Sequence, residues 1–221
     1  MTKHFLKDME GLATSMAIIS ARVEDLFLAA VDSLLARDAE KALEVIKADA
    51  EIDDLEVKLE EDALKILALH APVASDLRYL IAAIKINNDL ERVGDIAGNI
   101  ASRSRDLCKL PYVEPPEGFE EMVQNALDMI RDSFRACVAQ NAVLARNVFE
   151  KDDVVDNYNR ILLNSIEDRM VVESENIPAL MRWANVVRAV ERIGDYATNI
   201  AEDVIYMVDG EIVRHQAPVG D

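Results

Sequence analysis

Pairs of acidic residues four positions apart are the residues of this chain whose types and spacing could do chemistry. Four such pairs occupy matching places in the sequence: Asp49 with Asp53, Glu91 with Asp95, Asp152 with Asp156, and Glu191 with Asp195. Because residues i and i+4 of a helix lie on the same face, each pair would present two carboxylates side by side. Two carboxylates at this spacing repel each other by about 0.2–0.5 kcal/mol in water. The pairs therefore favour a surface that binds cations.

Repetition distinguishes these pairs from the many acids that simply face solvent. Acids make up 42 of the 221 residues, so isolated pairs at this spacing are expected by chance. Residues 91–101 read ERVGDIAGNIA and residues 191–201 read ERIGDYATNIA, which are identical at eight of eleven positions. The segments around Asp49 and Asp152 repeat at nearly the same offset. An internal duplication accounts for both matches and predicts two similar sites.

Further acids extend each predicted site along its helix. On one helix, Asp49, Asp53, Glu56 and Glu60 would fall within about 60° of arc, and the second half offers Asn159 and Glu202. The predicted metal ligands are Asp49, Asp53, Glu56, Glu91, Asp95, Asp152, Asp156, Glu191, Asp195 and Glu202. An oxygen-only set without His or Cys suits Mg, Mn, Ca or iron better than structural zinc.

Glycines beside the acids require an explanation, because glycine inside a helix costs roughly 1 kcal/mol relative to alanine. Gly94, Gly98 and Gly194 lie within the repeated segments. Close approach of another helix or of a metal cluster would explain these glycines.

An alternative to metal binding remains open for the acids. Arg92 and Arg192, with nearby lysines, would neutralise the carboxylates in salt bridges between helices.

The elements that must position these residues are long helices. Seven glycines and six prolines leave long windows in which apolar residues recur at helical spacing. The pattern predicts helices at roughly 3–36, 38–70, 73–109, 117–147, 149–175 and 178–210. A proline-rich linker at 111–118 separates the halves. We therefore expect an all-α fold of two tandem homologous three-helix bundles, residues 1–110 and 119–215, followed by a tail at 216–221.

Composition excludes several classes of function. The net charge of −18 opposes direct binding to nucleic acid, whose phosphates are also negative. No uncharged apolar run is long enough to insert into a membrane. Two cysteines without metal-ligand spacing, and an N-terminal MTKHFLKDMEGL without the apolar stretch of a signal peptide, make the cytoplasm the expected location.

An enzyme is the alternative class. Asp152-Asp153-Val-Val-Asp156 matches the DDxxD pattern with which all-α prenyl-diphosphate enzymes hold Mg and diphosphate. The chain lacks a second such motif, a basic cluster for the diphosphate and a glycine-rich phosphate loop. A non-enzymatic protein is thus the main expectation, and a Mg-dependent all-α enzyme acting on a phosphate or diphosphate ester is the alternative.

The doubled ERxGDxAxNIA motif, with HAPVASDLRYLIAAIKINNDLERVGD before its first copy and EDVIYMVDGEIVRH after its second, resembles the PhoU family of phosphate-signalling proteins. The resemblance covers in effect the whole chain. It implies two three-helix bundles whose Asp/Glu-xxx-Asp motifs bind metal ions, with iron, Mn or Mg expected. Ser102 stands where the family favours the glutamate that this chain has at Glu202, so the two halves differ in their predicted ligands.

The resemblance also implies a function and partners. PhoU-like proteins are cytoplasmic negative regulators of phosphate uptake and of the phosphate-starvation regulon. They relay the state of the high-affinity phosphate ABC transporter to a membrane sensor histidine kinase, and many are dimers. The expected partners are the transporter's ATPase subunit, the kinase and a second copy of the chain, which would bring the protein to the inner face of the membrane. We expect the metal-binding grooves to stiffen the bundles, whose helical surface docks basic or amphipathic surfaces of these partners.

Overall fold

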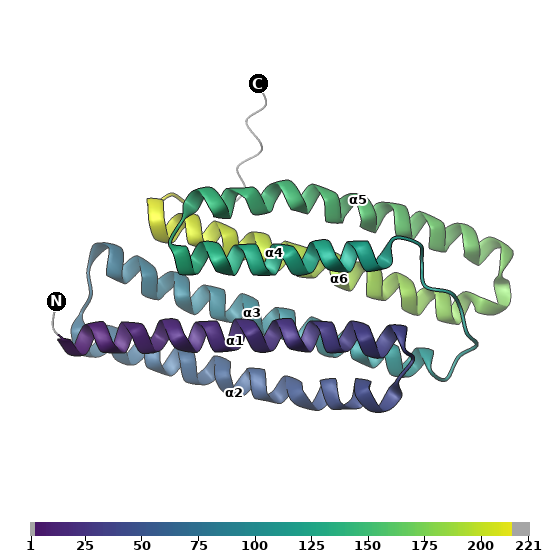
Figure 1. Ribbon diagram of the computed structural model, residues 1–221, viewed down its shortest axis with the longest axis horizontal. Coiled ribbons are helices and arrows are strands. Elements are labelled where there is room, and N and C mark those ends of the chain that lie inside the picture. The colour runs from purple at the N-terminus through teal and green to yellow at the C-terminus, as the bar shows by residue number, and fades with distance from the viewer. Residues whose placement is uncertain (1–2, 214–221) are drawn as a thin grey trace, which may run out of the picture.

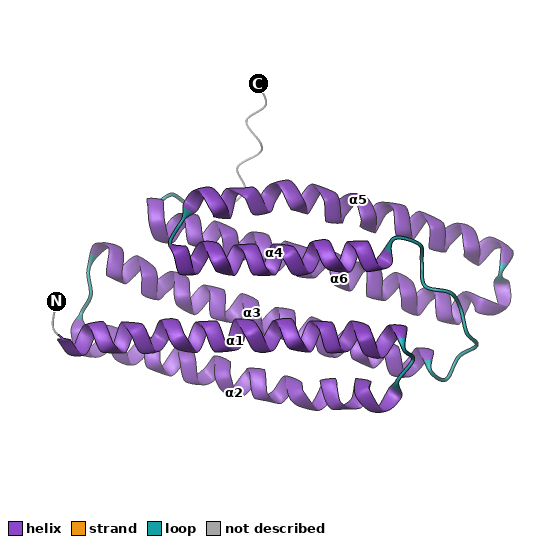
Figure 2. Ribbon diagram, viewed as in Figure 1, coloured by secondary structure: helices purple, strands orange, loops and turns teal. Residues whose placement is uncertain are grey.

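Six long helices make up the described part of the chain. The structure is a computed structural model that describes residues 3–213. The helices are α1 (Lys3–Leu35), α2 (Ala39–His70), α3 (Ala74–Leu107), α4 (Phe119–Ala139), α5 (Ala142–Val172) and α6 (Ile177–Asp209), with a 3₁₀ turn at Ser174–Asn176. Residues 3–213 contain no strand (Figure 2), which confirms the all-α prediction. The predicted tail, 216–221, lies outside the described residues.

The helices form two three-helix bundles that lie side by side along their length (Figure 1). Helices α1 to α3 make the first bundle and α4 to α6 the second. Helices α3 and α6 pack against each other as extensively as against the helices of their own bundles, so they form the centre of the molecule. Within residues 3–213, no helix combines the length and apolar character needed to cross a membrane.

The turn between α4 and α5 lies well before its predicted place. The sequence pattern predicts helices at 117–147 and 149–175, whereas α4 ends at Ala139 and α5 begins at Ala142. Gln140 adopts a left-handed conformation (φ 47°), and the Asn141 side chain accepts hydrogen bonds from the backbone N–H groups of Val143 and Leu144. Asn141 therefore caps α5, and α4 is left with 21 residues against 33 for α1.

Ion pairs join the two bundles, two of them between α3 and α6 and one between α1 and α4. Lys85 of α3 pairs with Asp203 of α6, whose side chain is 2% exposed. Arg131 of α4 reaches Glu24 of α1 at 2.8 Å, and Arg182 of α6 reaches Asp106 of α3 at 3.2 Å. These pairs fix the lateral position of one bundle against the other.

Candidate metal centres

Helices α2 and α3 bring acids of the first bundle together along one groove. We call this set the first acidic groove: Asp49, Asp53 and Glu56 of α2 with Glu91 and Asp95 of α3. Four of these residues are half-buried, and Asp53 is exposed. The neighbouring residues Ile96 and Ile100 of α3 are buried in the core, so α3 faces the core and the groove with different sides.

The acids of the first acidic groove act on one another across the two helices. Burial, and to a smaller extent the charges of Asp95 and Asp53, together raise the pKa of Asp49 to about 6. Burial also raises the pKa of Glu91, and the Asp95 carboxylate adds to that shift while Arg92 opposes it. The groove is therefore a place where negative charge is unfavourable and a cation would be stabilising.

Glycine in α3 allows α2 to approach closely at this groove. A Cβ at Gly98 would stand 3.1 Å from Asp49 Oδ2. A Cβ at Gly94 would stand 3.0 Å from Ile52 Cδ1 and 3.4 Å from Asp49 Oδ1. The bare backbone thus provides the space in which the Asp49 carboxylate lies, which explains both glycines by close helix approach.

Helices α5 and α6 form the equivalent second acidic groove, made of Asp152, Asp156, Glu191 and Asp195. Burial, and to a smaller extent the charges of Asp156 and Asp195, together raise the pKa of Asp152 to about 6. Burial is also the main reason that the pKa values of Glu191 and Asp195 are raised. The duplication of the sequence therefore appears as two grooves with the same electrostatic character.

The second acidic groove differs from the first at two equivalent residues and in the packing around a third. Asn159 stands where the first half has Glu56, and Thr198 stands where it has Gly98. A Cβ at Gly194 would meet Met129 and Val155 only at 3.5 Å, which is ordinary van der Waals contact. The buried Oδ1 atom of Asn159 has no hydrogen-bond partner. The second groove thus has one carboxylate fewer and an amide oxygen that remains available to a ligand.

Glu202, the last of the predicted ligands, lies on α6 beyond Glu191 and Asp195. It lines a cavity of about 220 Å³ together with Lys85, Asp203 and Tyr206, where α6 meets α3. The position of Glu202 around α6 is close to that of Glu191, so its place among the ligands of the second acidic groove stays a prediction.

Asn87 is a polar residue of the first groove that the sequence analysis did not select. It is 1% exposed, and its Nδ2 donates a hydrogen bond to the backbone oxygen of Glu56 at 2.9 Å. Its Oδ1 has no hydrogen-bond partner. Asn87 lies one helical turn before Glu91 and shares a helix face with Gly94 and Gly98, and this spacing was the available signal.

The salt bridges of Arg92 stay within its own helix. Its guanidinium lies 3.5 Å from Glu91 and 3.3 Å from Asp95, both on α3, and its side chain is 51% exposed. Burial raises the pKa of Glu56 on α2 and the Arg92 charge opposes that shift, so Arg92 offsets part of the negative charge of both helices and the interhelical alternative stays open. Within residues 3–213, no three His, Cys, Asp or Glu side chains converge closely enough to hold a metal ion. The donors nevertheless suit a hard cation, because they are carboxylates with unpartnered amide oxygens beside them.

Two copies of a three-helix bundle, each with an acidic groove on corresponding helices, define a duplicated helical-bundle protein. A family model described as the PhoU domain matches residues 16–104 and 119–204, one match in each bundle. The chain belongs to the PhoU family.

Individual relatives agree with this assignment over nearly their whole length. A "Phosphate-specific transport system accessory protein PhoU homolog" of Aquifex aeolicus is 37% identical, with 95% of each chain covered. A homologue with a similar name from Methanothermobacter thermautotrophicus is 33% identical, covering 94% of this chain and 95% of the relative. These names describe accessory proteins and not enzymes, so they support the non-enzymatic expectation over a Mg-dependent enzyme.

Solved structures show the same fold. The crystal structure of PhoU from Pseudomonas aeruginosa matches with a TM-score of 0.87 and 32% identity, covering 94% of this chain and all of that one. The phosphate transport system regulatory protein PhoU from Streptococcus pneumoniae matches with a TM-score of 0.88 and 29% identity, covering 95% and 99%. The prediction of two homologous three-helix bundles is confirmed.

Proposed function

We propose that this chain is a cytoplasmic, metal-binding negative regulator of phosphate uptake and of the phosphate-starvation regulon. It acts as an adaptor between the ATPase subunit of a phosphate ABC transporter and a membrane sensor histidine kinase. The observation that carries the proposal is the full-length similarity to accessory proteins of a phosphate-specific transport system. The absence of a helix able to span a membrane within residues 3–213 is compatible with reaching the transporter through protein partners.

The acidic grooves supply the metal-binding part of the proposal. Asp49, Glu91 and Asp95 would hold a cation in the first bundle, and Asp152, Glu191 and Asp195 would do so in the second. A bound Mg, Mn or iron ion would supply positive charge that offsets the repulsion between these carboxylates. With that repulsion removed, α2 is held against α3 and α5 against α6, so the helical surfaces keep one shape.

The charge of the molecule supports the adaptor role. A net charge of −18 on a 221-residue chain attracts basic surfaces and speeds their encounter with it. The helices also carry exposed apolar residues, such as Leu69, Val143 and Val171, that an amphipathic partner could cover. A second copy of the chain in a homodimer belongs to the same proposal.

A phosphate-starvation reporter tests the regulatory proposal directly. The gene is deleted from its own host, and the reporter is read in high phosphate with and without a restored copy. We expect a reporter that is fully on in the deletion strain and silent after restoration. A reporter that stays off in the deletion strain would contradict the assignment as a negative regulator.

A further inference from the structure

The short helix α4 leaves part of α1 uncovered at the seam between the bundles. Helix α4 ends at Ala139, and the N-terminal part of α1 extends beyond this end (Figure 1). Helices α1 and α4 touch only slightly. Two adjoining cavities of about 320 and 380 Å³ lie here and share Ala13, Tyr79 and Gln140 as lining residues. We call them together the end groove.

The end groove has a deformable apolar floor. Met9, Met16 and Met207 come from α1 and α6, and Tyr79 and Phe134 complete the floor from α3 and α4. The Tyr79 hydroxyl contacts Met16 Sδ at 3.9 Å. Methionine side chains are flexible and polarisable, so a floor of this kind adapts to apolar side chains of different shapes.

The sides of the end groove suit an entering helix. Ala13 and Ala17 of α1 are exposed and have small side chains, which leaves room for a second helix to lie against α1. Leu6, 45% exposed, and Val138, 67% exposed, stand at opposite ends of the groove. An amphipathic helix docks in such a groove through apolar residues spaced at i, i+3 or i+4, and i+7.

Charge at the edge of the end groove selects the polar face of the partner. Glu10 of α1 and Asp76 of α3 line it, and none of its described lining residues is Lys or Arg. The chain as a whole carries a net charge of −18. A partner segment with basic residues beside its apolar face is therefore attracted to the end groove more strongly than an acidic segment is.

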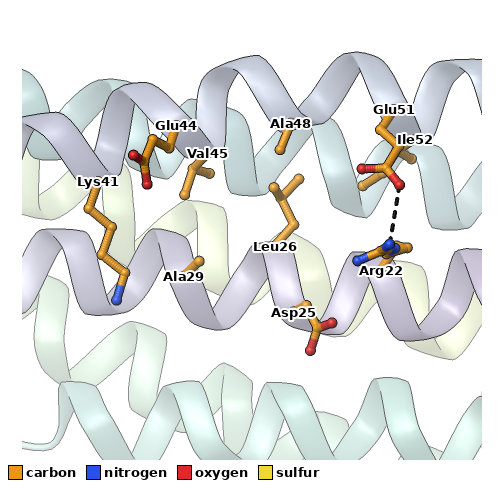
Figure 3. A pocket seen from close by; sticks show the side chains of 10 residues that line it. All are labelled: Arg22, Asp25, Leu26, Ala29, Lys41, Glu44, Val45, Ala48, Glu51 and Ile52. Atoms are coloured by element: carbon orange, nitrogen blue, oxygen red, sulfur yellow. Dashed lines mark ion pairs between the residues drawn. The ribbon is translucent and has the colours of Figure 1, made fainter.

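The pocket between α1 and α2 lacks this selectivity (Figure 3). It has a volume of about 250 Å³, and Leu26 and Val45 contribute to its apolar lining. Lys41 and Arg22 stand among acids at its edge, and an ion pair between Arg22 and Glu51 at 3.4 Å joins its two sides. Because Arg22 and Lys41 would repel the basic residues of a partner segment, such a segment should prefer the end groove to this pocket.

We infer that the end groove binds a basic amphipathic helix of a partner protein, with its apolar face on the methionine-rich floor and its basic residues beside Glu10 and Asp76. The inference rests on the proposed adaptor function and names the kind of segment through which a partner is held.

A peptide-binding experiment on the full chain tests this inference. The probe is a fluorescent synthetic peptide of about 18 residues, with leucines at i, i+3 or i+4, and i+7 and lysines elsewhere. A peptide of the same composition in scrambled order controls for charge alone. We expect the amphipathic peptide to bind in 0.15 M salt at least about tenfold more tightly than the scrambled one.

Two valine substitutions form a matched pair for locating the peptide. Val138→Lys places a positive charge in the end groove, and Val171→Lys makes the same change near the end of α5, where the side chain is 83% exposed. We expect Val138→Lys to weaken binding about tenfold or more and Val171→Lys less than about twofold. Both positions are exposed, and circular dichroism checks that both variants fold.

Three outcomes would overturn the inference. Equal weakening by both substitutions would mean general attraction to an acidic surface, and equal binding of both peptides would mean that no apolar face is recognised. A dimer that Val138→Lys converts to a monomer, with no peptide binding, would assign the groove to a second copy. None of these measurements involves phosphate, so a failure here leaves the reporter experiment to decide the proposed function separately.

Discussion

The Asp49 carboxylate of α2 lies against the bare α-carbon of Gly98 in α3, with Oδ2 3.1 Å from the point where a side chain would begin. The absence of a side chain at Gly98 leaves the space that this carboxylate occupies. In the second bundle the equivalent position is Thr198, so this particular contact belongs to the first acidic groove alone. The consequence of burying such a group appears in how stability depends on pH.

Without metal, the protein should lose stability as pH rises from about 4 to about 6. The pKa values of Asp49 and Asp152 are raised from 3.8 to about 6 in the folded state. The folded protein therefore binds protons that the unfolded chain has already released, and its advantage disappears as pH rises through the folded pKa. Urea unfolding in the presence of a chelator, at a series of pH values, measures this slope.

The double variant Asp49→Asn with Asp152→Asn is the control for that slope. It should show a flatter pH profile between 4 and 6, and a higher free energy of unfolding than the parent at pH 7 without metal. The test is the difference between the two pH profiles, because other groups also contribute to each profile. The pKa of Glu173 is lowered, mainly by its hydrogen bond with Arg169, so Glu173 makes stability increase with pH. Identical profiles for parent and variant would contradict the electrostatic account of the grooves.

Alanine at two equivalent glycines should change stability in opposite directions. Gly94→Ala puts a methyl group 3.0 Å from Ile52 Cδ1 in a tightly packed position, and overpacking of this kind costs about 1–3 kcal/mol. Gly194→Ala meets its neighbours at 3.5 Å, so the higher helix propensity of alanine should stabilise by up to about 1 kcal/mol. Urea unfolding at one pH measures the change in the free energy of unfolding for each variant. Changes of the same sign would show that the two grooves are packed alike.

The ion pair between Lys85 and Asp203 should contribute strongly to bundle association. Lys85→Met leaves the Asp203 carboxylate, 2% exposed, without its ammonium partner, and we expect a loss of about 3 kcal/mol. Lys41→Met breaks the solvated pair with Asp32 and should cost no more than about 0.5 kcal/mol.

Adding Asp203→Asn to Lys85→Met should recover most of the lost stability, because the buried carboxylate that Lys85 neutralised is then removed as well. Thermal and urea unfolding of the four chains measure these differences. Equal losses of stability in Lys85→Met and Lys41→Met would show that the ion pair between Lys85 and Asp203 contributes no more than a solvated surface pair.

Much of the fold could be predicted because the apolar spacing is regular and the breakers are few. The turn at Gln140 and Asn141 could not, since no glycine or proline marks it and the apolar pattern runs through it. Only the hydrogen bonds from Val143 and Leu144 to the Asn141 side chain reveal where α5 begins.

The sequence predicts which acids of the candidate site share a helix face, but it does not predict how neighbouring helices pack around them. The spacing of Asp49 and Asp53, repeated at Asp152 and Asp156, places acids on one helix face without knowledge of the packing. The limit of this reasoning is that the angle around one helix does not tell which neighbouring helix covers a given face. The same spacing could have indicated Asn87, which is buried and shares a helix face with Gly94 and Gly98, whereas Asn88 is exposed.

Cation titration of the metal-stripped full chain tests the central claim that both acidic grooves bind metal. Mn²⁺ is titrated calorimetrically into the parent, a first-groove variant (Asp49→Asn with Glu91→Gln), a second-groove variant (Asp152→Asn with Glu191→Gln) and their combination. We predict saturable binding at both grooves of the parent, loss of one groove's binding in each single-groove variant, and loss of all binding in the combination. Unchanged Mn²⁺ binding in the combined variant, or none in the parent at millimolar Mn²⁺, would contradict the account.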